Sequence, residues 1–269
     1  MKYLFLIWCF LASTFTAFAQ ELYVNTEPAS NMARHSLGIR LENQGYFNPG
    51  FKNRSTVELM YGASKNWMVH TSAYVSDFYQ QKQHLEGFSA YAKYRFLSVD
   101  SVQRHFRGAA FIKASTINNP IINQEINLEG DNSGLQGGLV FTQLLHKLAI
   151  SGSVSYLRGL DNQNNQNNPI PVGFAKDAVA YTLSSGYLLF PKNYTNYNQT
   201  NVNLYLELLG KTNPGYRQSY LDAAPAVQFI FNSVFRVDFS YRTPLYNSMT
   251  RNSENMYLVR LEYNFFNLF

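Results

Sequence analysis

The sequence predicts an all-β chain, a transmembrane antiparallel up-and-down β-barrel of about twelve strands that follows a cleaved signal peptide. Apolar and polar residues alternate with a period of two over stretches of roughly ten residues, which is the pattern of half-buried strands. Within each stretch, every second residue points to the same face, and we call such a set of alternate positions a parity. Charged residues keep to one of the two parities. Short connections alternate with longer polar ones rich in Asn, Gly, Pro and Ser.

The composition excludes two other classes of protein. Of the 269 residues, 14% are charged and 16% are aromatic, with 20 Tyr and 21 Phe, whereas a disordered chain would lack the aromatics. A helical membrane bundle would need several apolar runs of roughly 20 residues, and the only long apolar run lies at the N-terminus. The basic residues are scattered and the formal net charge is a mild +5, so we expect no nucleic-acid partner.

Residues 1–19 are typical of a secretory signal peptide. Lys2 supplies the positive start, Tyr3 to Leu11 form the apolar run, and Ala17-Phe18-Ala19 is a small-x-small cleavage site. We expect cleavage near Ala19/Gln20, which also removes Cys9, the single cysteine of the chain.

The rest of the chain divides into two expected parts. Residues 20–33 precede the first alternating stretch and are expected to form a periplasmic or lumenal segment. Residues 34–269 are expected to form one outer-membrane barrel domain, located in the cell outer membrane.

The first six expected strands span residues 36–46, 56–63, 67–75, 88–96, 106–113 and 135–142. One parity of each strand is apolar and would face lipid: Leu37, Ile39 and Leu41; Val57, Leu59 and Tyr61; Trp67, Val69, Ala73 and Val75; Phe88, Ala90, Ala92, Tyr94 and Phe96; Phe106, Gly108, Ala110 and Ile112; Leu135, Gly137, Leu139 and Phe141. The other parity carries the charges and would face inward.

The last six expected strands span residues 148–156, 179–187, 202–208, 220–229, 235–242 and 257–269. Their apolar parity is equally regular: Leu148, Ile150, Val154 and Tyr156; Val179, Tyr181, Leu183 and Tyr187; Val202, Leu204, Leu206 and Leu208; Leu221, Ala223, Val227 and Phe229; Phe235, Val237, Phe239 and Tyr241; Tyr257, Val259, Leu261, Tyr263, Phe265 and Phe269.

The lengths of the connections are a second, independent indication of the fold, because outer-membrane barrels have short periplasmic turns and longer outer loops. Short connections are expected at residues 64–66, 146–147 and 232–233. Longer ones are expected at residues 47–54, 76–87, 116–133, 159–177, 211–218 and 245–255. Two mid-length connections, at residues 98–105 and 191–199, fall where short turns are due. An even strand count would leave both termini on the periplasmic side.

A secreted β-sandwich or lipocalin-like barrel also alternates, but three features favour the membrane barrel. The apolar parity is almost free of Lys, Arg and Glu. The chain ends in an aromatic residue, Phe269. Aromatic residues gather near expected strand ends, as in interfacial girdles: Tyr46, Trp67, Phe78, Phe88, Phe96, Phe106, Tyr156, Tyr187, Tyr241 and Tyr257.

Two sequence stretches resemble known families. The ending Tyr257-Leu-Val-Arg-Leu-Glu-Tyr-Asn-Phe-Phe-Asn-Leu-Phe269 resembles the C-terminal signal of Gram-negative outer-membrane barrels, in which Tyr263, Phe265 and Phe269 would be read by the barrel assembly machinery. The Asn-rich and Tyr-rich composition is similar to that of Bacteroidota barrels. Residues 57–70 (VELMYGASKNWMVH) resemble the strand-turn-strand unit of small transporter barrels of aromatic-degradation operons. This resemblance implies passage of a small solute and assigns no individual functional residue.

The inward parity carries nearly balanced charges: Arg40, Lys93, Arg95, Arg107, Lys113, Arg236, Arg242 and Arg260 against Glu42, Glu58, Glu207, Asp222, Asp238 and Glu262. Closure of the barrel would place the first two expected strands beside the last two. The lumen and selectivity candidates would then meet there: Arg40, Glu42, Glu58, Arg236, Asp238, Arg260 and Glu262. They would form either a structural ion-pair network or a charged constriction that selects solutes.

The opposite wall is expected to carry small inward residues: Gly138, Ser151, Ser153, Ser155, Ala180, Thr182, Ser184 and Gly186. Small residues leave space. That space would be an aqueous path, or it would hold residues 20–33 or the loop at residues 116–133, whose isoleucines and Leu128 are too apolar for a solvated tip.

We expect no enzyme, no cofactor and no metal site. His35 and Ser36 are adjacent and would point to opposite faces of a strand. His70 and Ser72 share the inward face, but the sequence identifies no orienting carboxylate. No metalloprotease helix motif, nucleophile elbow or Gly-rich phosphate loop occurs.

The function expected from the sequence is passive or facilitated passage of a small solute across the outer membrane. Two alternatives stay open. One is a plugged structural or partner-binding barrel without transport, and the other is a membrane-embedded enzyme.

Overall fold

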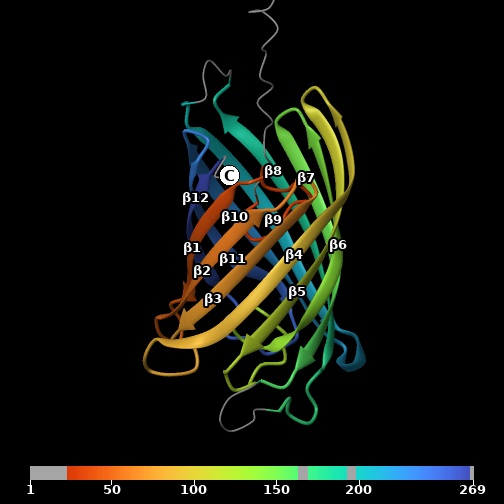
Figure 1. Ribbon diagram of the computed structural model, residues 1–269. Helices are drawn as coiled ribbons and strands as arrows, with labels where there is room; N and C mark the ends of the chain where they lie inside the picture. The colour runs from red at the N-terminus through yellow and green to blue at the C-terminus, as the bar shows by residue number, and fades with distance from the viewer. Residues whose placement is uncertain (1–22, 163–168, 193–197, 267–269) are drawn as a thin grey trace, which may run out of the picture.

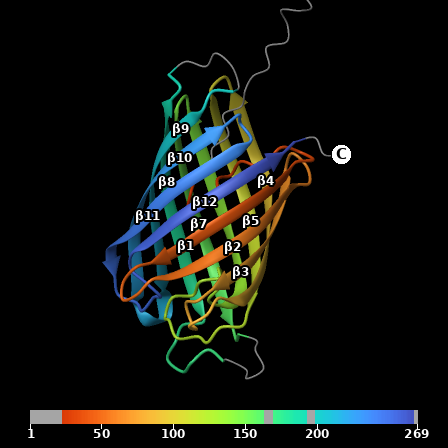
Figure 2. The same ribbon diagram turned by 90° about the vertical axis from the view of Figure 1, so that its left-hand side faces the viewer.

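The computed structural model describes residues 23–162, 169–192 and 198–266. Over these residues the chain forms twelve strands: β1 (Leu37–Tyr46), β2 (Lys52–Gly62), β3 (Trp67–Ser76), β4 (His84–Ser101), β5 (Arg104–Ile117), β6 (Ser133–Leu145), β7 (Leu148–Leu160), β8 (Asp177–Phe190), β9 (Asn201–Asn213), β10 (Gln218–Phe231), β11 (Phe235–Asn247) and β12 (Met256–Phe265). Each strand pairs antiparallel with the next, and β12 pairs with β1, so the sheet closes into a barrel (Figures 1 and 2). The predicted fold class is confirmed. No helix in the described part of the chain is long and apolar enough to cross a membrane.

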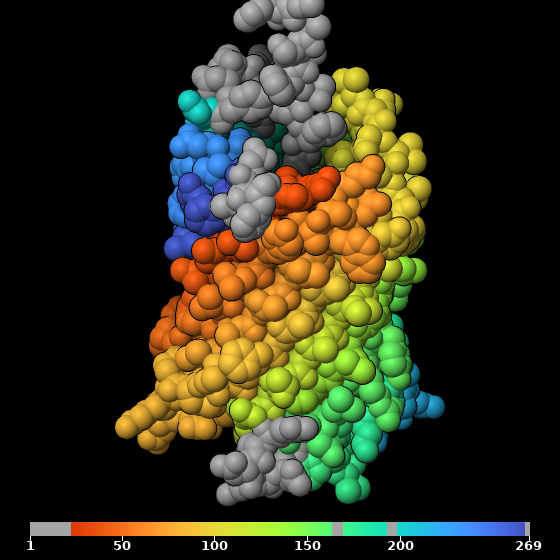
Figure 3. All heavy atoms as spheres, viewed as in Figure 1, coloured from red at the N-terminus to blue at the C-terminus, as the bar shows by residue number. Residues whose placement is uncertain are grey.

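The two faces of the strands differ in the way that the sequence predicts. Large apolar side chains of the outward parity are exposed; Leu183 and Leu206 in the middle of their strands are 53% and 50% exposed. The inward parity is buried, and the side chains of Glu207 and Asp238 have no exposed surface. Figure 3 shows the near wall, formed by β1 to β5, as a continuous layer of side chains. An apolar exterior around a charged interior is typical of a barrel whose outer surface contacts lipid.

The two ends of the barrel are unequal. At the end where β1 begins and β12 ends, called here the turn end, β4 and β5 are joined by residues 102–103 and β6 and β7 by residues 146–147. The opposite end, called here the loop end, carries residues 77–83, 118–132, 161–162, 169–176 and 248–255. The expected alternation of short and long connections is present with two exceptions: at the turn end β8 ends at Phe190 and β9 begins only at Asn201, and at the loop end β9 and β10 are separated by only residues 214–217.

Several expected connections are shorter than the sequence suggested. β4 begins at His84, inside the expected loop at residues 76–87. The mid-length connection at residues 98–105 is wrong, because β4 and β5 continue through it to a two-residue turn. The long loop at residues 211–218 is also wrong, since β9 runs to Asn213 and only a short 3-10 turn, Pro214–Tyr216, precedes β10. β2 begins at Lys52, inside the expected loop at residues 47–54. Polar strand ends paired with their neighbours have the same composition as loops, which hides them from a composition-based reading.

Two aromatic residues assigned to the interfacial girdle point elsewhere. Tyr46 is buried, and its ring lies 5.2 Å from that of Phe78. The Phe78 ring in turn lies 4.5 Å from the Arg54 guanidinium carbon inside the loop end. These two rings pack in the lumen, whereas Trp67, Phe96 and others of the predicted set are exposed on the outside.

The lumen is filled from both ends. Residues 23–33 lie inside the barrel against the small-residue wall: Tyr23 and Val24 pack with Leu144, Ala149 and Tyr205, while Ala29 packs with Ala109 and Val140. The loop at residues 118–132 folds inward from the loop end, where Ile126 and Leu128 pack against Leu157, Ala175 and Ala178. A Cβ atom at Gly186 would lie 2.3 Å from the Tyr205 ring, so the small wall is required by this packing.

Candidate functional site

The predicted seam residues meet inside the barrel where β1, β2, β11 and β12 adjoin. In the strand register Arg40 lies opposite both Glu58 and Glu262. Its guanidinium is 2.8 Å from each of those carboxylates and 3.0 Å from Glu27 of the N-terminal segment. Glu262 also pairs with Arg236 at 2.8 Å. Arg40 therefore links the wall to the segment in the lumen.

The remaining seam residues form the loop-end half of the same network. Arg260 lies opposite Glu42 and Asp238 in the register. It pairs with Glu42 at 2.5 Å and approaches Asp238 at 3.8 Å. Asp238 lies 3.0 Å from Arg236, which joins the two halves. All seven predicted seam residues are thus in one ion-pair network, and each buried charge has an opposite partner, as burial requires.

Glu207 on β9 holds the N-terminal segment against the opposite wall. Its Oε1 atom accepts hydrogen bonds from the backbone N–H groups of Val24 and Asn25, at 3.1 and 2.8 Å, and from the Asn25 amide. Its Oε2 atom accepts one from the Thr26 hydroxyl at 2.7 Å. A carboxylate that accepts several hydrogen bonds is well compensated for burial. We call these contacts the latch.

Two cations on β4 and β5 hold the next part of the segment. Lys93 Nζ donates to the carbonyl oxygens of Pro28 and Ser30, at 2.7 and 2.9 Å. Arg107 donates to the Ser30 hydroxyl at 2.9 Å. The segment is therefore fixed to three parts of the barrel wall: the seam, the latch and this pair.

Arg54 on β2 anchors the inward loop at the loop end. Its guanidinium pairs with Glu86 and with Asp131, each at 2.5 Å, and donates to the Glu129 carbonyl oxygen. Asp131 also accepts hydrogen bonds from Tyr79 and Asn252. The sequence reading missed Arg54 and Glu86 because it placed both in loops.

Glu125 anchors the same loop to the β9 and β10 wall. Its Oε1 atom lies 2.8 Å from Lys211 Nζ and accepts a hydrogen bond from the Tyr220 hydroxyl at 2.8 Å. Burial alone would raise the pKa of Glu125, but Lys211, Arg242 and Arg251 outweigh it and lower the pKa to about 2. Lys211 shares the inward parity of Glu207, which is the signal that would have identified it.

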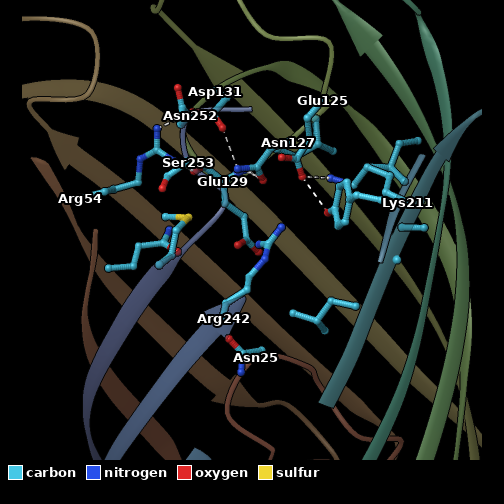
Figure 4. A pocket seen from close by; sticks show the side chains of 18 of the residues that line it. Asn25, Arg54, Glu125, Asn127, Glu129, Asp131, Lys211, Arg242, Asn252 and Ser253 are labelled. Atoms are coloured by element: carbon cyan, nitrogen blue, oxygen red, sulfur yellow. Dashed lines mark hydrogen bonds and ion pairs between the residues drawn. The ribbon is translucent and has the colours of Figure 1, made fainter. Parts of the chain in front are cut away.

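A polar cavity of about 200 Å³ lies between these two fillings of the lumen (Figure 4). Asn25 of the N-terminal segment borders it on one side, and the inward loop borders it on the other. Its charged lining residues are Arg54, Lys113, Glu125, Glu129, Asp131, Lys211 and Arg242. Five of these seven were absent from the predicted inward charges, namely Arg54 and Lys211 at strand ends and Glu125, Glu129 and Asp131 in the loop. Lys113 and Arg242 were predicted to face inward, and they do.

The cluster of Glu27, Glu58 and His70 has ligand-type atoms within 4.8 Å of one another. Arg40 contacts both carboxylates, and Lys93 Nζ lies 3.7 Å from Glu27, so cations already balance these acids. Metal ligation there would require a divalent ion beside two fixed positive charges.

The His70 and Ser72 pair does have a carboxylate beside it, which the sequence did not reveal. His70 Nδ1 is 3.2 Å from Glu58 Oε1, and the Ser72 hydroxyl donates to Glu58 Oε2 at 2.9 Å. Since the hydroxyl donates to the carboxylate, the order of contacts is not the nucleophile–base–acid order of a catalytic triad.

Two of the three predicted assembly-signal residues, Tyr263 and Phe265, lie at the turn end. Tyr263 and Phe265 are exposed on the outer face of β12, with ring centroids 4.7 Å apart. Phe269 lies outside the described residues, as does the expected signal peptide.

Comparisons with known proteins show the fold alone. No protein-family profile and no curated protein sequence matches the chain. Among solved structures, the chain is similar to the COG4313 outer membrane channel from Pseudomonas putida F1, with a TM-score of 0.60 and 11% identity over 90% of this chain and 100% of that one. The KdgM porin aligns over 86% of this chain and 99% of its own, with a TM-score of 0.47 and 9% identity.

Proposed function

We propose that this protein is an outer-membrane channel through which a small polar solute passes. The observation that carries the proposal is the polar cavity of about 200 Å³ inside a closed barrel whose exterior is apolar. A barrel of twelve strands is wide enough to leave lumenal space when its inward side chains are small. The likeness in fold to an outer membrane channel supports this assignment.

The same proposal orients the barrel in the outer membrane. The turn end would face the periplasm and the loop end would face outside, because short turns and both termini lie on the periplasmic side in such barrels. Residues 1–19 would be removed as a signal peptide near Ala19/Gln20. Tyr263, Phe265 and Phe269 would be recognised by the assembly machinery. Solute would then enter the cavity past the inward loop.

Passage would be facilitated rather than free, because the N-terminal segment lies between the cavity and the turn end. Residues 23–33 are held by the latch, by Lys93 and Arg107, and by Arg40. Beside the apolar packing of Tyr23, Val24 and Ala29, these contacts are polar and can be exchanged for water, so the segment would move aside while the wall stays intact. The seam residues would hold both the wall and the N-terminal segment. They would select solutes only after that segment has moved out of the lumen.

A plugged barrel that binds a partner is the second candidate. It is favoured by the number of fixed contacts on residues 23–30, which a permanently closed barrel would keep. Both candidates predict the same folded structure, and they differ in whether current passes.

Single-channel conductance of the refolded mature chain in planar bilayers tests the proposal, with heat-modifiable gel mobility as the folding control. We expect brief openings in the native chain. Glu207→Ala should increase the open fraction by at least tenfold, since Glu207 accepts several hydrogen bonds from the segment, a single one of them contributes about 1.5–3 kcal/mol, and 1.4 kcal/mol corresponds to a factor of ten. Glu254→Ala, which alters an exposed loop-end carboxylate, is the matched control.

Two outcomes would contradict the channel. One is a folded native chain and a folded Glu207→Ala variant that both stay electrically silent, which supports the plugged barrel. The other is failure of the refolded chain to insert, which contradicts the membrane assignment itself.

A further inference from the structure

The charged side chains that line the lumenal cavity differ in how many of their donor and acceptor atoms already have hydrogen-bond partners. The Arg54 guanidinium donates hydrogen bonds to Glu86, Asp131 and the Glu129 carbonyl oxygen. The Lys211 ammonium donates to Glu125 and the Ile126 carbonyl oxygen. These two cations hold the inward loop in place. Because these two cations are engaged with the protein, other charged side chains of the cavity would contact a solute.

Arg242 is the cation with unused donors. Its Nε atom donates to Asp222, a carboxylate that Arg251 also holds, at 2.6 Å. The Tyr220 ring lies 5.2 Å from the guanidinium carbon and supports it. Among the described residues no hydrogen-bond partner occurs for Arg242 Nη1 or Nη2, and Figure 4 shows the side chain rising from β11 into the cavity. Two adjacent guanidinium N–H groups form the fork that binds a planar carboxylate.

Glu125 and Glu129 on the inward loop are the anions with unused acceptors. Each uses Oε1 for a lysine, Lys211 or Lys113, at 2.8 Å. Neither Oε2 atom has a hydrogen-bond donor within the described part of the chain. No ion pair within 4.0 Å joins Arg242 to either glutamate in that part. Unused positive and negative groups therefore face one cavity without neutralising each other directly.

We propose that this cavity binds small zwitterionic solutes, with the solute carboxylate on Arg242 and the solute ammonium on Glu125 and Glu129. The inference rests on the proposed channel and names its solute class. A dicarboxylate would place its second charge against the two glutamates, and a simple amine would meet Arg242. A zwitterion satisfies both ends, and a cavity of about 200 Å³ admits only a small one.

A matched four-carbon series tests the proposal on the refolded mature chain: 4-aminobutanoate, butanoate, butylammonium and butanamide, titrated by calorimetry. We expect 4-aminobutanoate to bind about tenfold more tightly than each of the other three, which corresponds to about 1.4 kcal/mol. Equal affinity across the series, or tightest binding of butanoate or butylammonium, would overturn the proposal.

Three variants assign the roles. Arg242→Lys keeps a positive charge for Asp222 but removes the fork, and it should lose the preference for 4-aminobutanoate over butylammonium. Arg242→Gln should lose it too. Glu129→Gln should weaken binding of 4-aminobutanoate but not that of butanoate. Arg158→Gln, which alters an exposed arginine paired with Asp177, is the charge-matched control and should bind as the native chain does. Native-like preference in folded Arg242→Lys would overturn the role of Arg242.

Potassium chloride conductance of the same preparations separates this inference from the proposed channel. A zwitterion preference in an electrically silent barrel would uphold the binding site and contradict the channel. Conductance without the preference would uphold the channel and overturn the site.

Discussion

At the scale of single residues, this barrel is stabilised by ion pairs between buried side chains. Glu262 is the clearest case, because its side chain is 4% exposed and it pairs with both Arg40 and Arg236. Arg40 in turn contacts three carboxylates from three segments of the chain. Removing one member of such a network leaves a buried charge without compensation, which costs more than the pair itself contributes.

Glu262→Gln should therefore lower the free energy of unfolding by about 3–5 kcal/mol, although glutamine has nearly the same shape. Urea unfolding of the mature chain in detergent, followed by the fluorescence of Trp67, measures this. Glu254→Gln, an exposed loop-end carboxylate, is the control and should change little. The double variant Glu262→Gln with Arg236→Gln should cost less than the two single changes added. Strict additivity would contradict a coupled network.

At the scale of elements, two segments outside the strands determine what the lumen contains. The N-terminal segment is held mainly by backbone groups that donate to Glu207 or accept from Lys93. The inward loop at residues 118–132 is held mainly by side-chain ion pairs, at Arg54 and at Glu125. Both attachments therefore depend on carboxylates: the loop depends on Glu125 and Asp131, and the latch depends on Glu207.

The attachment of the inward loop should withstand moderate acid. The folded-state pKa of Glu125 is about 2, below its ordinary value of 4.5. A lowered pKa means that the stabilisation is present above the ordinary value and is lost as pH falls through about 2. Spin labels on cysteines at exposed Ile122 and Tyr216 should report an unchanged distance distribution from pH 7 to pH 5, and a broadened one as pH falls toward about 2.

Glu125→Gln should broaden that distribution already at pH 7, because Lys211 loses its ion-pair partner. Exchange of Glu254 for Gln in the same labelled chain is the control. If broadening in the native chain began above the ordinary pKa of a glutamate, Glu125 would not be the group that holds the loop.

At the scale of the whole molecule, the barrel is stable because its two surfaces face different solvents. Its outward parity is apolar from β1 to β12, and its inward parity carries the ion pairs and the polar cavity. Backbone hydrogen bonds are completed by closure of β1 on β12, which leaves no free sheet edge. Lipid is therefore part of what holds the fold.

Leu206→Arg, in the middle of β9 on the outward face, should destabilise the barrel in lipid vesicles by about 2–4 kcal/mol, since arginine is costly at the bilayer midplane. Equilibrium unfolding in vesicles by urea measures this effect. Leu206→Ala is the control for lost side-chain volume and should cost less. An arginine variant as stable as the alanine variant would mean that this face does not contact the hydrocarbon core.

The sequence by itself determined the closed barrel, its strand parity and the composition of the seam. Period-two alternation fixes which face each side chain takes, and antiparallel closure then brings Arg40 beside Glu58 and Glu262. Strand ends such as Lys52 and Lys211 escaped prediction because paired polar residues resemble loop residues. Tyr46 and Phe78 were misplaced for a similar reason, since an aromatic residue near a strand end fits an interface or a lumen equally well.

Only the tertiary structure decided how the lumen is filled. Residues 23–33 and the loop at residues 118–132 show no periodicity that points to their neighbours, and the contacts of Glu27, Glu125 and Arg54 join segments far apart in the chain. Such contacts depend on the three-dimensional path of irregular backbone, which alternation does not encode. The charges that surround Arg242 were likewise decided by the tertiary structure, because Glu125 and Glu129 reach the cavity from the inward loop.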